Sequence, residues 1–321
     1  MVTYLLRLKN GGVREPHWHP NAAELTYCVS GRAEMTIYPS NADADSFTID
    51  SFTIDSFTID PGEVVFIPQG FMHDIENISN DEAKFVLAFN NERPTTIGIS
   101  GSVGSMPNRV MNKTFGIKPP NTFFNGFNNN SPIDIVIGSK PTNMLEPVSP
   151  ITKIPNSHKF DVQGIAPQIQ TAGGTVAKAN ASSFPILSGS RMSFFSLIMN
   201  PGAIREPHWH PNASELGYIL DGTARLIVLS PYGIVDTFEV GPGEIYFIPA
   251  AFFHYIENLD SNKRTHFALF FGSDLPGDIG IYGMLSAYSN DVSGASFNLD
   301  PAYFNNLPRL TEDVLVVSGG G

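Results

Sequence analysis

A nine-residue stretch occurs twice in this chain. Residues 14–22 read REPHWHPNA, and residues 205–213 repeat the same nine letters. A glutamate, a glycine and a distant histidine follow each copy. They are Glu24, Gly31 and His73 after the first copy, and Glu215, Gly222 and His254 after the second. A repeat of this length, with matching residues behind it, predicts that one structural unit is written twice.

The spacing of the matching residues is the same in the two halves except at one insertion. The offset between them is 191 residues at His17 and His208 but 181 at His73 and His254, so ten residues are extra in the first half. The insertion is visible as three consecutive copies of Ser-Phe-Thr-Ile-Asp over residues 46–60. Because side chains alternate faces along a strand, ten extra residues restore the facing of everything downstream, whereas five would invert it. We expect a structural irregularity here, either a lengthened strand pair or a segment that loops out.

The pattern between these landmarks predicts an all-β protein with a few short helices. The chain of 321 residues contains 29 glycines and 25 prolines, and its short apolar runs end at turn residues. Short helices are expected near 97–105, 279–287 and 300–307. We expect a first domain over 1–140, a proline-rich linker over 141–157 and a second domain over 158–321. The first domain has only sixteen residues before its histidine pair, so its opening strands are missing from the sequence as given.

Charge and composition exclude some partners. A net charge of −12 argues against nucleic acid, because affinity for nucleic acid rests on phosphate neutralisation by Lys and Arg. No apolar run is long enough for a membrane span. The single cysteine and the lack of a signal-peptide layout at the N-terminus favour a cytoplasmic protein, with a trimmed secretion signal as the alternative. A homo-oligomer is expected, since another subunit or the other domain must cover the incomplete first domain.

The repeated histidines predict two metal sites. Side chains two residues apart on a strand share a face, so His17 and His19 point together. A carboxylate follows five residues after the second histidine, and a third histidine comes from a later strand. Three imidazoles with one carboxylate suit Mn, Fe, Co, Ni, Cu or Zn. The expected ligands are His17, His19, Glu24 and His73 in the first half, and His208, His210, Glu215 and His254 in the second.

This spacing resembles the two motifs of the cupins. The first motif is glycine, five residues, His-x-His, four residues, glutamate, six residues and glycine, which Gly202 to Gly222 meets in full. The second motif appears in Gly62 to Asn77 and again in Gly243 to Asn258, where Ala251 replaces the usual glycine. The resemblance covers nearly the whole chain. It implies two tandem jelly-roll barrels, each with a metal in its mouth.

Within the cupins, the wording around the histidines is most similar to the oxalate decarboxylase group. That resemblance implies one Mn per domain and a small carboxylate substrate, oxalate, which is converted to formate and carbon dioxide. It also implies that Arg14 and Arg205, three residues before each first histidine, bind the substrate carboxylate. A planar and permanently charged guanidinium suits that role.

One element of the group's pattern is missing. The group carries a flexible lid, Ser-Glu-Asn-Ser, whose glutamate handles the proton, and no such tetrapeptide occurs here. Counting from the strand ends places Thr96 near that position in the first half and Asp278 in the second, so Glu92 and Asp278 are the remaining candidate acids. The second domain, complete and with Asp278 nearby, is the favoured chemical site. A metal-binding or storage protein without decarboxylase activity, and oxalate oxidation or dioxygenation, stay open as alternatives.

Overall fold

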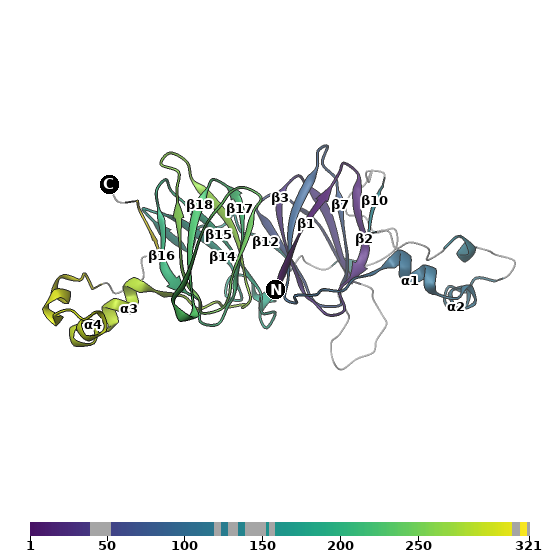
Figure 1. Cartoon of the computed structure of the whole chain (residues 1–321). Coiled ribbons are helices and arrows are strands. Elements are labelled where there is room, and N and C mark those ends of the chain that lie inside the picture. Colours follow the sequence, from purple (N-terminus) through teal and green to yellow (C-terminus); the bar gives the residue numbers. More distant parts are fainter. Residues whose placement is uncertain are drawn as a thin grey trace. The chain divides into compact units, whose positions relative to one another are not determined.

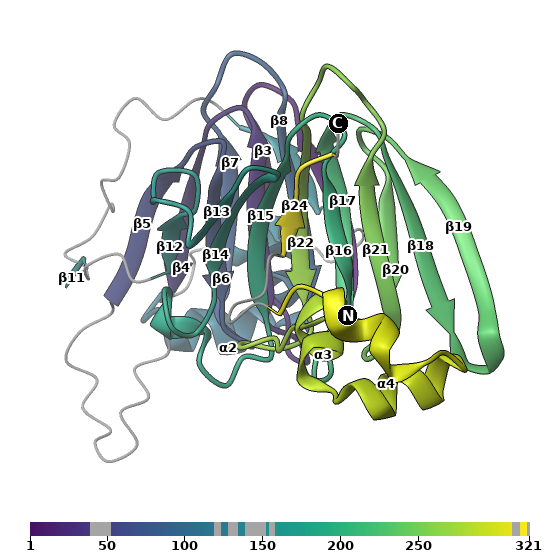
Figure 2. The ribbon, with the colours of Figure 1, turned by 90° about the vertical axis from the view of Figure 1, so that its left-hand side faces the viewer.

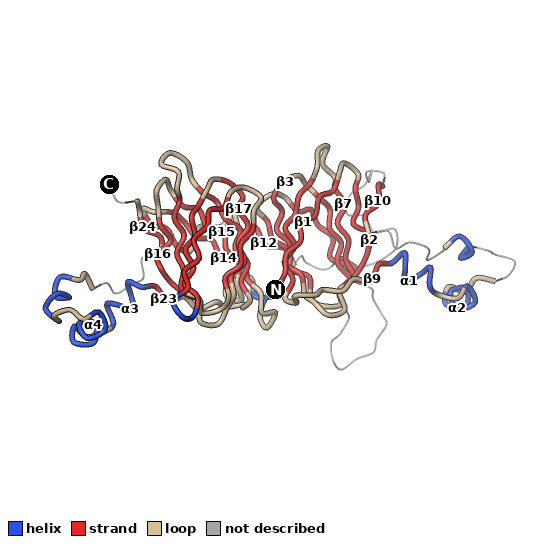
Figure 3. The backbone as a smooth tube through the Cα atoms, in the orientation of Figure 1, coloured by secondary structure: helices blue, strands red, loops and turns tan. Residues whose placement is uncertain are grey.

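The structure of the chain, a computed structural model, describes residues 1–38, 53–118, 123–127, 134–138, 152–153, 158–309 and 315–319. The chain forms two compact units, Met1–Asp161 and Val162–Gly321. Each unit consists of two sheets whose apolar faces enclose a core (Figures 1 and 3). The expected all-β class with a few short helices is confirmed.

The first unit carries a five-stranded sheet, β1-β8-β3-β6-β12, and a seven-stranded sheet, β10-β2-β7-β4-β5-β11 with β9 beside β2. Its elements are β1 (Val2–Leu8), β2 (Gly12–Trp18), β3 (Glu24–Ser30), β4 (Ala33–Tyr38), β5 (Thr53–Ile59), β6 (Glu63–Ile67), β7 (Met72–Asn77), β8 (Ala83–Phe89), β9 (Ile97–Gly98), α1 (Ile99–Ser105), α2 (Asn108–Thr114), η1 (Phe123–Gly126), β10 (Ile135–Ile137), β11 (Thr152–Lys153) and β12 (Lys159–Asp161).

The second unit carries two six-stranded sheets, β13-β14-β15-β22-β17-β20 and β19-β18-β21-β16-β23 with β24 beside β16 (Figure 2). Its elements are β13 (Ile169–Thr171), β14 (Gly174–Ala179), η2 (Pro185–Leu187), β15 (Ser193–Met199), β16 (Ile204–Trp209), β17 (Glu215–Asp221), β18 (Ala224–Ser230), η3 (Pro231–Gly233), β19 (Ile234–Val240), β20 (Ile245–Ile248), β21 (Phe253–Asn258), β22 (Thr265–Phe271), β23 (Ile279–Gly280), α3 (Ile281–Ala287), α4 (Asn290–Phe297), η4 (Pro301–Asn306) and β24 (Val316–Val317).

The last copy of the inserted pentapeptide faces the core, as the even count predicts. Met35 in β4 pairs with Phe57 in β5, and the corresponding Leu226 pairs with Phe238 in the second unit. Phe57 is buried. The insertion therefore leaves the facing of the downstream strands unchanged. Residues 46–52, which form the first copy and the start of the middle one, lie outside the described residues.

The two units differ at the edges of their sheets. In the described part of the first unit no strand corresponds to β13 and β14, so β1 forms the edge of its sheet. At the opposite edge β12 pairs with β6, and Lys159 Nζ lies 2.8 Å from Glu63 Oε1. Residues 158–161, which the sequence analysis placed at the start of the second domain, thus add a strand to the first unit.

The short helices begin close to where the sequence predicts them. α1, α3 and η4 fall within the three expected segments, and the carboxylate of Asp300 accepts a hydrogen bond of 2.8 Å from the Ala302 amide at the start of η4. None of the described helices is long and apolar enough to cross a membrane.

The glutamate of each repeated motif connects the histidine strand to the following helix. Glu15 is buried and accepts hydrogen bonds from the backbone amide (3.1 Å) and hydroxyl (3.0 Å) of Ser100 in α1. Glu206 accepts one from the Tyr282 amide of α3 at 3.3 Å. A carboxylate at the first turn satisfies amides that have no partner inside the helix. This contact accounts for the recurrence of Glu15 and Glu206 although neither contributes to the histidine clusters.

We expect the second unit to lose stability in acid, because the pKa of His266 in β22 is lowered in the folded protein. Burial lowers the pKa of His266 to about 4, against a smaller opposing effect of Asp221, and its Nε2 lies 2.8 Å from Ser196 Oγ. Below pH 6.5 the unfolded chain binds a proton here that the folded chain does not, so stability falls as pH falls from 6.5 towards 4, by about 1–2 kcal/mol between pH 7 and 5. His266→Gln, which can bond Ser196 but cannot become charged, should reduce this loss in urea unfolding. Equal pH dependence in both proteins would contradict the assignment.

Candidate metal centres

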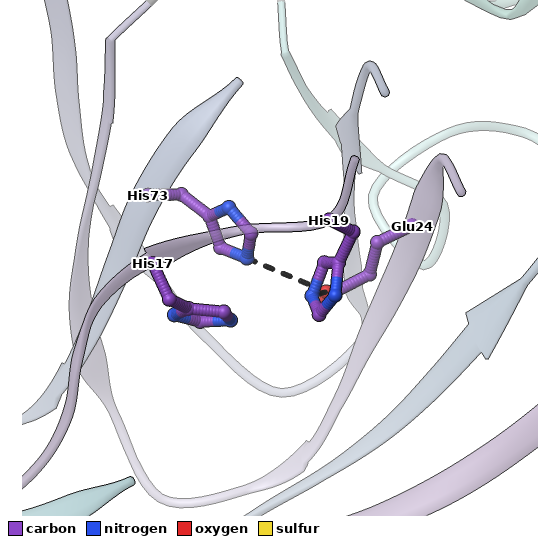
Figure 4. Close-up of side chains that lie close together, drawn as sticks. All are labelled: His17, His19, Glu24 and His73. Carbon is purple, nitrogen blue, oxygen red and sulfur yellow. Dashed lines mark ion pairs between the residues drawn. The ribbon is translucent and has the colours of Figure 1, made fainter. Parts of the chain in front are cut away.

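Four side chains converge in each unit. In the first unit His17 lies on β2, and His19 follows the last residue of β2. Glu24 lies at the start of β3, and His73 lies on β7 (Figure 4). The second unit brings His208, His210, Glu215 and His254 together from the corresponding places. All eight side chains are buried, and the ligand atoms within each group lie within 4.8 Å of one another. The sequence predicted both groups in full, and their role as ligands stays a prediction.

Backbone carbonyls orient every imidazole in these groups. In the first unit the Nδ1 atoms of His17, His19 and His73 lie 2.7–3.0 Å from the carbonyls of Glu15, Thr95 and Phe71. In the second unit the corresponding distances are 2.6–2.8 Å. A neutral imidazole that donates from Nδ1 presents a lone pair on Nε2. The second nitrogen of each ring is thus available for a metal.

The glutamate of each group has two distinct oxygens. Glu24 Oε2 lies 3.1 Å from His19 Nε2 and 3.4 Å from His73 Nε2, while its Oε1 accepts a bond of 2.5 Å from Thr26. In the second unit Tyr246 donates to Glu215 Oε1 at 2.7 Å. One oxygen is therefore fixed by a neighbouring hydroxyl, and the other faces the imidazoles.

The pKa shifts of His17, Glu24 and His208 favour deprotonated ligands. The pKa of His210 is raised instead, because the lowering effect of burial is outweighed by the hydrogen bond and charge of Glu215. Burial lowers the pKa of His17 to about 2, helped by His73 and Arg14, and holds that of His208 well below its ordinary value. Burial alone would raise the pKa of Glu24, but the His19 and His73 imidazoles that face its carboxylate outweigh that effect and keep it well below the ordinary value. Metal ligands must be neutral imidazoles and ionised carboxylates.

The donor set fits a divalent transition metal. Among the described residues, Nε2 of His19, His73 and His254 are buried without a hydrogen-bond partner. Bare nitrogen lone pairs that face a carboxylate oxygen repel it unless a cation lies between them. A metal ion would satisfy all four atoms of each group, and three imidazoles with one carboxylate suit such an ion.

Metal removal should therefore destabilise both units. When the free ion concentration is one hundred times the dissociation constant, binding stabilises the unit by about 2.7 kcal/mol. We expect Mn²⁺ to raise the melting temperature, EDTA to reverse the rise, and elemental analysis to give two ions per chain. Glu215→Gln should leave one ion per chain. Mg²⁺, which prefers oxygen ligands, should have little effect on the melting temperature. Unchanged melting in Mn²⁺ would contradict metal binding.

A register shift brings each motif arginine onto the same side as the histidines. Arg14 and His17 are three residues apart, so a regular strand would place them on opposite faces. The pairing of β2 with β7 shifts between these two residues, and β16 shifts equally between Arg205 and His208. Both arginines consequently line the cavities that contain the histidines. The proline inside each motif was the available signal, because proline within a strand marks a bulge or an edge.

The arginines have carboxylate partners from different elements. Arg14 Nη1 donates to the Asp134 carbonyl at 2.8 Å and lies 3.4 Å from its exposed carboxylate, just before β10. Arg205 Nη1 donates to the carbonyl of Leu315 at 3.1 Å, and its Nη2 pairs with Asp278. Burial lowers the pKa of Arg14, partly offset by Asp134 and Glu24. The sequence analysis did not identify Asp134, since nothing local to it signals a contact with Arg14.

The two cavities differ in size because the sheets that close them differ. The first cavity measures about 770 Å³ and is bordered by Tyr4 and Leu5 of the edge strand β1. The second measures about 400 Å³, and Ile169, Val176 and Lys178 of β13 and β14 line it. Strands β13 and β14, which have no counterpart among the described strands of the first unit, thus narrow the second cavity.

The two candidate acids, Asp278 and Glu92, lie in different surroundings. Asp278 lines the second cavity, and its Oδ1 is buried without a hydrogen-bond partner among the described residues. Thr96 occupies the corresponding place in the first unit, with its hydroxyl 3.3 Å from His19 Nδ1. Glu92 lies exposed in the loop after β8 and is not among the residues that line the first cavity. Of the two candidate acids, Asp278 thus lies in a cavity beside the expected metal ligands and Glu92 does not.

Comparison with known proteins identifies the family. A family model described as Cupin matches residues 1–123 and 160–303. The chain belongs to the cupin family. With two matched segments and two barrels, it is a bicupin.

The bicupin is similar to several oxalate decarboxylases. It is 27% identical to a probable oxalate decarboxylase of Arthroderma benhamiae over 92% of this chain and 70% of that protein. It is 28% identical to oxalate decarboxylase OxdC of Bacillus subtilis over 83% of this chain and 66% of that protein. The chain therefore spans about two thirds of the length of these relatives. A structure of the Bacillus enzyme that concerns its Mn(II) centres superposes with a TM-score of 0.83 at 25% identity, covering 98% of this chain and 80% of that one.

Proposed function

We propose that this bicupin is a Mn-dependent enzyme that converts oxalate to formate and carbon dioxide, with the second unit as the chemical site. The observation that carries the proposal is the arrangement in the second cavity, where Arg205 and Asp278 lie beside a buried set of three imidazoles and one carboxylate. The similarity to oxalate decarboxylases supports the choice of oxalate and of Mn.

The residues of the second cavity account for substrate binding. His208, His210, Glu215 and His254 would hold Mn, which when bound supplies positive charge next to the reacting carboxylate. Of the five donors of Arg205, one is used by the Leu315 carbonyl and one by Asp278, so others remain for a ligand carboxylate. Arg205 is held by these two contacts, and its fixed guanidinium would orient the substrate before reaction.

Asp278 accounts for the proton that the reaction requires. Decarboxylation breaks the carbon–carbon bond, releases carbon dioxide and leaves an electron pair on the remaining carbon, which takes one proton to become formate. Asp278 presents a buried oxygen without a partner among the described residues, and its other oxygen pairs with Arg205. It is the acid in the second cavity that could deliver this proton from Oδ1.

Oxidation of oxalate is the second candidate function. It would convert oxalate to two molecules of carbon dioxide while dioxygen takes the electrons and two protons to become hydrogen peroxide. This route needs no protonation of carbon. It is favoured for the first unit, where Thr96 replaces the acid and cannot supply a proton at ordinary pH.

A product assay tests both functions. Full-length protein loaded with Mn would be given oxalate at mildly acidic pH while formate and peroxide are followed separately. We expect formate in excess, with two Mn per chain. Peroxide in excess would favour oxidation, and two bound ions without either product would leave a metal-binding bicupin. The homo-oligomer and the cytoplasmic location stay predictions, for which light scattering and fractionation of cells are the direct measurements.

A further inference from the structure

Lys178 brings a second cation into the second cavity. It lies on β14 two residues after Val176, so the two side chains share a face, and both line the cavity that Arg205 lines. The Lys178 ammonium lies 5.1 Å from the centre of the Phe195 ring. Burial lowers the pKa of Lys178, and the charge of Arg205 adds to this effect while Asp278 opposes it. The lysine is thus partly desolvated and faces the same space as the arginine.

The Lys178 ammonium has no carboxylate partner in the part of the chain that the structure describes. The ammonium lies over the face of the Phe195 ring, and the carboxylate that acts on its pKa among the described residues, Asp278, pairs with Arg205. A cation that is partly removed from water and lacks a counter-ion is a favourable place for an anion. The phenylalanine ring holds the ammonium without neutralising it.

No such cation is found among the described residues that line the first cavity. It contains Arg14 with Glu24 and Asp134, whereas the second contains Arg205 and Lys178 with Glu215 and Asp278. With equal metal charge, the second cavity carries one positive charge more than the first. The difference arises from β14, which has no counterpart in the described first unit.

We propose that Lys178 is a second anchor for the ligand, so that the second unit selects short dicarboxylates in their dianionic form. One carboxylate would lie at Arg205 and the metal ligands, and the other would meet the ammonium of Lys178. This inference rests on the proposed function, since it assumes that a carboxylate binds in the cavity. It adds a specificity-determining residue that has no equivalent in the nine-residue repeat.

Matched ligands test the proposal. Oxamate has the shape of oxalate, with one carboxylate replaced by a neutral amide. Calorimetric titration of the Mn-loaded full chain with each ligand would be carried out for the wild type and for Lys178→Met, Lys178→Gln and Lys178→Arg. Lys263→Met removes a charge from an exposed loop and serves as the matched control. Circular dichroism would establish that each variant is folded.

The expected result is a change in selectivity rather than a general loss. Lys178→Met and Lys178→Gln should weaken oxalate binding about tenfold or more at one class of sites and oxamate binding less than about threefold, as expected for loss of one charge-assisted contact. Lys178→Arg should retain most of the oxalate affinity, and Lys263→Met should leave both ligands unaffected. Equal loss of both ligands, or unchanged oxalate binding, would overturn the role of Lys178. If the wild type binds neither ligand, the proposed function fails before Lys178 is tested.

Discussion

Gly217→Thr is expected to destabilise the second unit by about 3–5 kcal/mol, because overpacking adds to the loss of a hydrogen bond to a charged group. Gly217 lies opposite Tyr246 across β17 and β20, and a Cβ atom on Gly217 would overlap the tyrosine ring. The ring occupies this space because its hydroxyl donates to Glu215 Oε1. Urea unfolding followed by fluorescence would measure the loss, and the Mn content would fall with it.

The double variant Gly217→Thr with Tyr246→Val should recover most of this loss. The first unit has Thr26 and Val65 at the corresponding positions, again opposite each other, and Thr26 donates to Glu24 Oε1. The corresponding oxygen of the glutamate is thus satisfied in two ways. The first unit uses a threonine opposite a valine, and the second uses a tyrosine opposite a glycine. Tyr246→Val alone should cost about 2–4 kcal/mol, since it leaves a cavity and an unsatisfied oxygen. Additive losses in the double variant would show that the two pairs are not equivalent.

The sequence predicted the metal clusters because their geometry is local or repeated. Histidines two apart on a strand share a face whatever the rest of the fold does. The repetition of the whole pattern then matched Glu24 with Glu215, and also His73 with His254, which lie far from the histidine pairs in the chain. The even length of the insertion likewise predicted that Phe57 would face the core.

What the sequence could not show depends on contacts between distant segments. Asp134 reaches Arg14 only because β10 pairs with β2. Lys178 enters the second cavity only because β14 joins its sheet. The register shift that turns the arginines towards the histidines depends on pairing with β7 and β21, which the proline within each motif signals only indirectly. Counting from the strand ends pointed to Thr96 and Asp278, which line the two cavities, whereas Glu92, the acid closest to Thr96 in its segment, lies exposed in its loop.

Arg205→Gln is expected to lower kcat/KM for oxalate by about 10²–10³, the range found for loss of a preorganised group that stabilises charge. Arg14→Gln should lower it less than about threefold if the second unit is the chemical site. The comparison is matched because each arginine precedes the same register shift in its strand and donates to the carbonyl of the residue just before a short neighbouring strand. Formate production at several oxalate concentrations would measure both values.

The loss in Arg205→Gln has to be separated from damage to the cavity. Removing Arg205 leaves Asp278 without its partner, and a partly buried carboxylate left alone is unfavourable. The double variant Arg205→Gln with Asp278→Asn removes both charges, so it should regain stability without regaining activity. Asp278→Asn alone keeps a polar group beside Arg205 but cannot deliver a proton, and it should shift the products from formate towards peroxide. If Arg14→Gln lowered kcat/KM for oxalate more than Arg205→Gln did, the chemical site would be in the first unit. Any formate would then need another proton source, because Thr96 stands in place of the acid there.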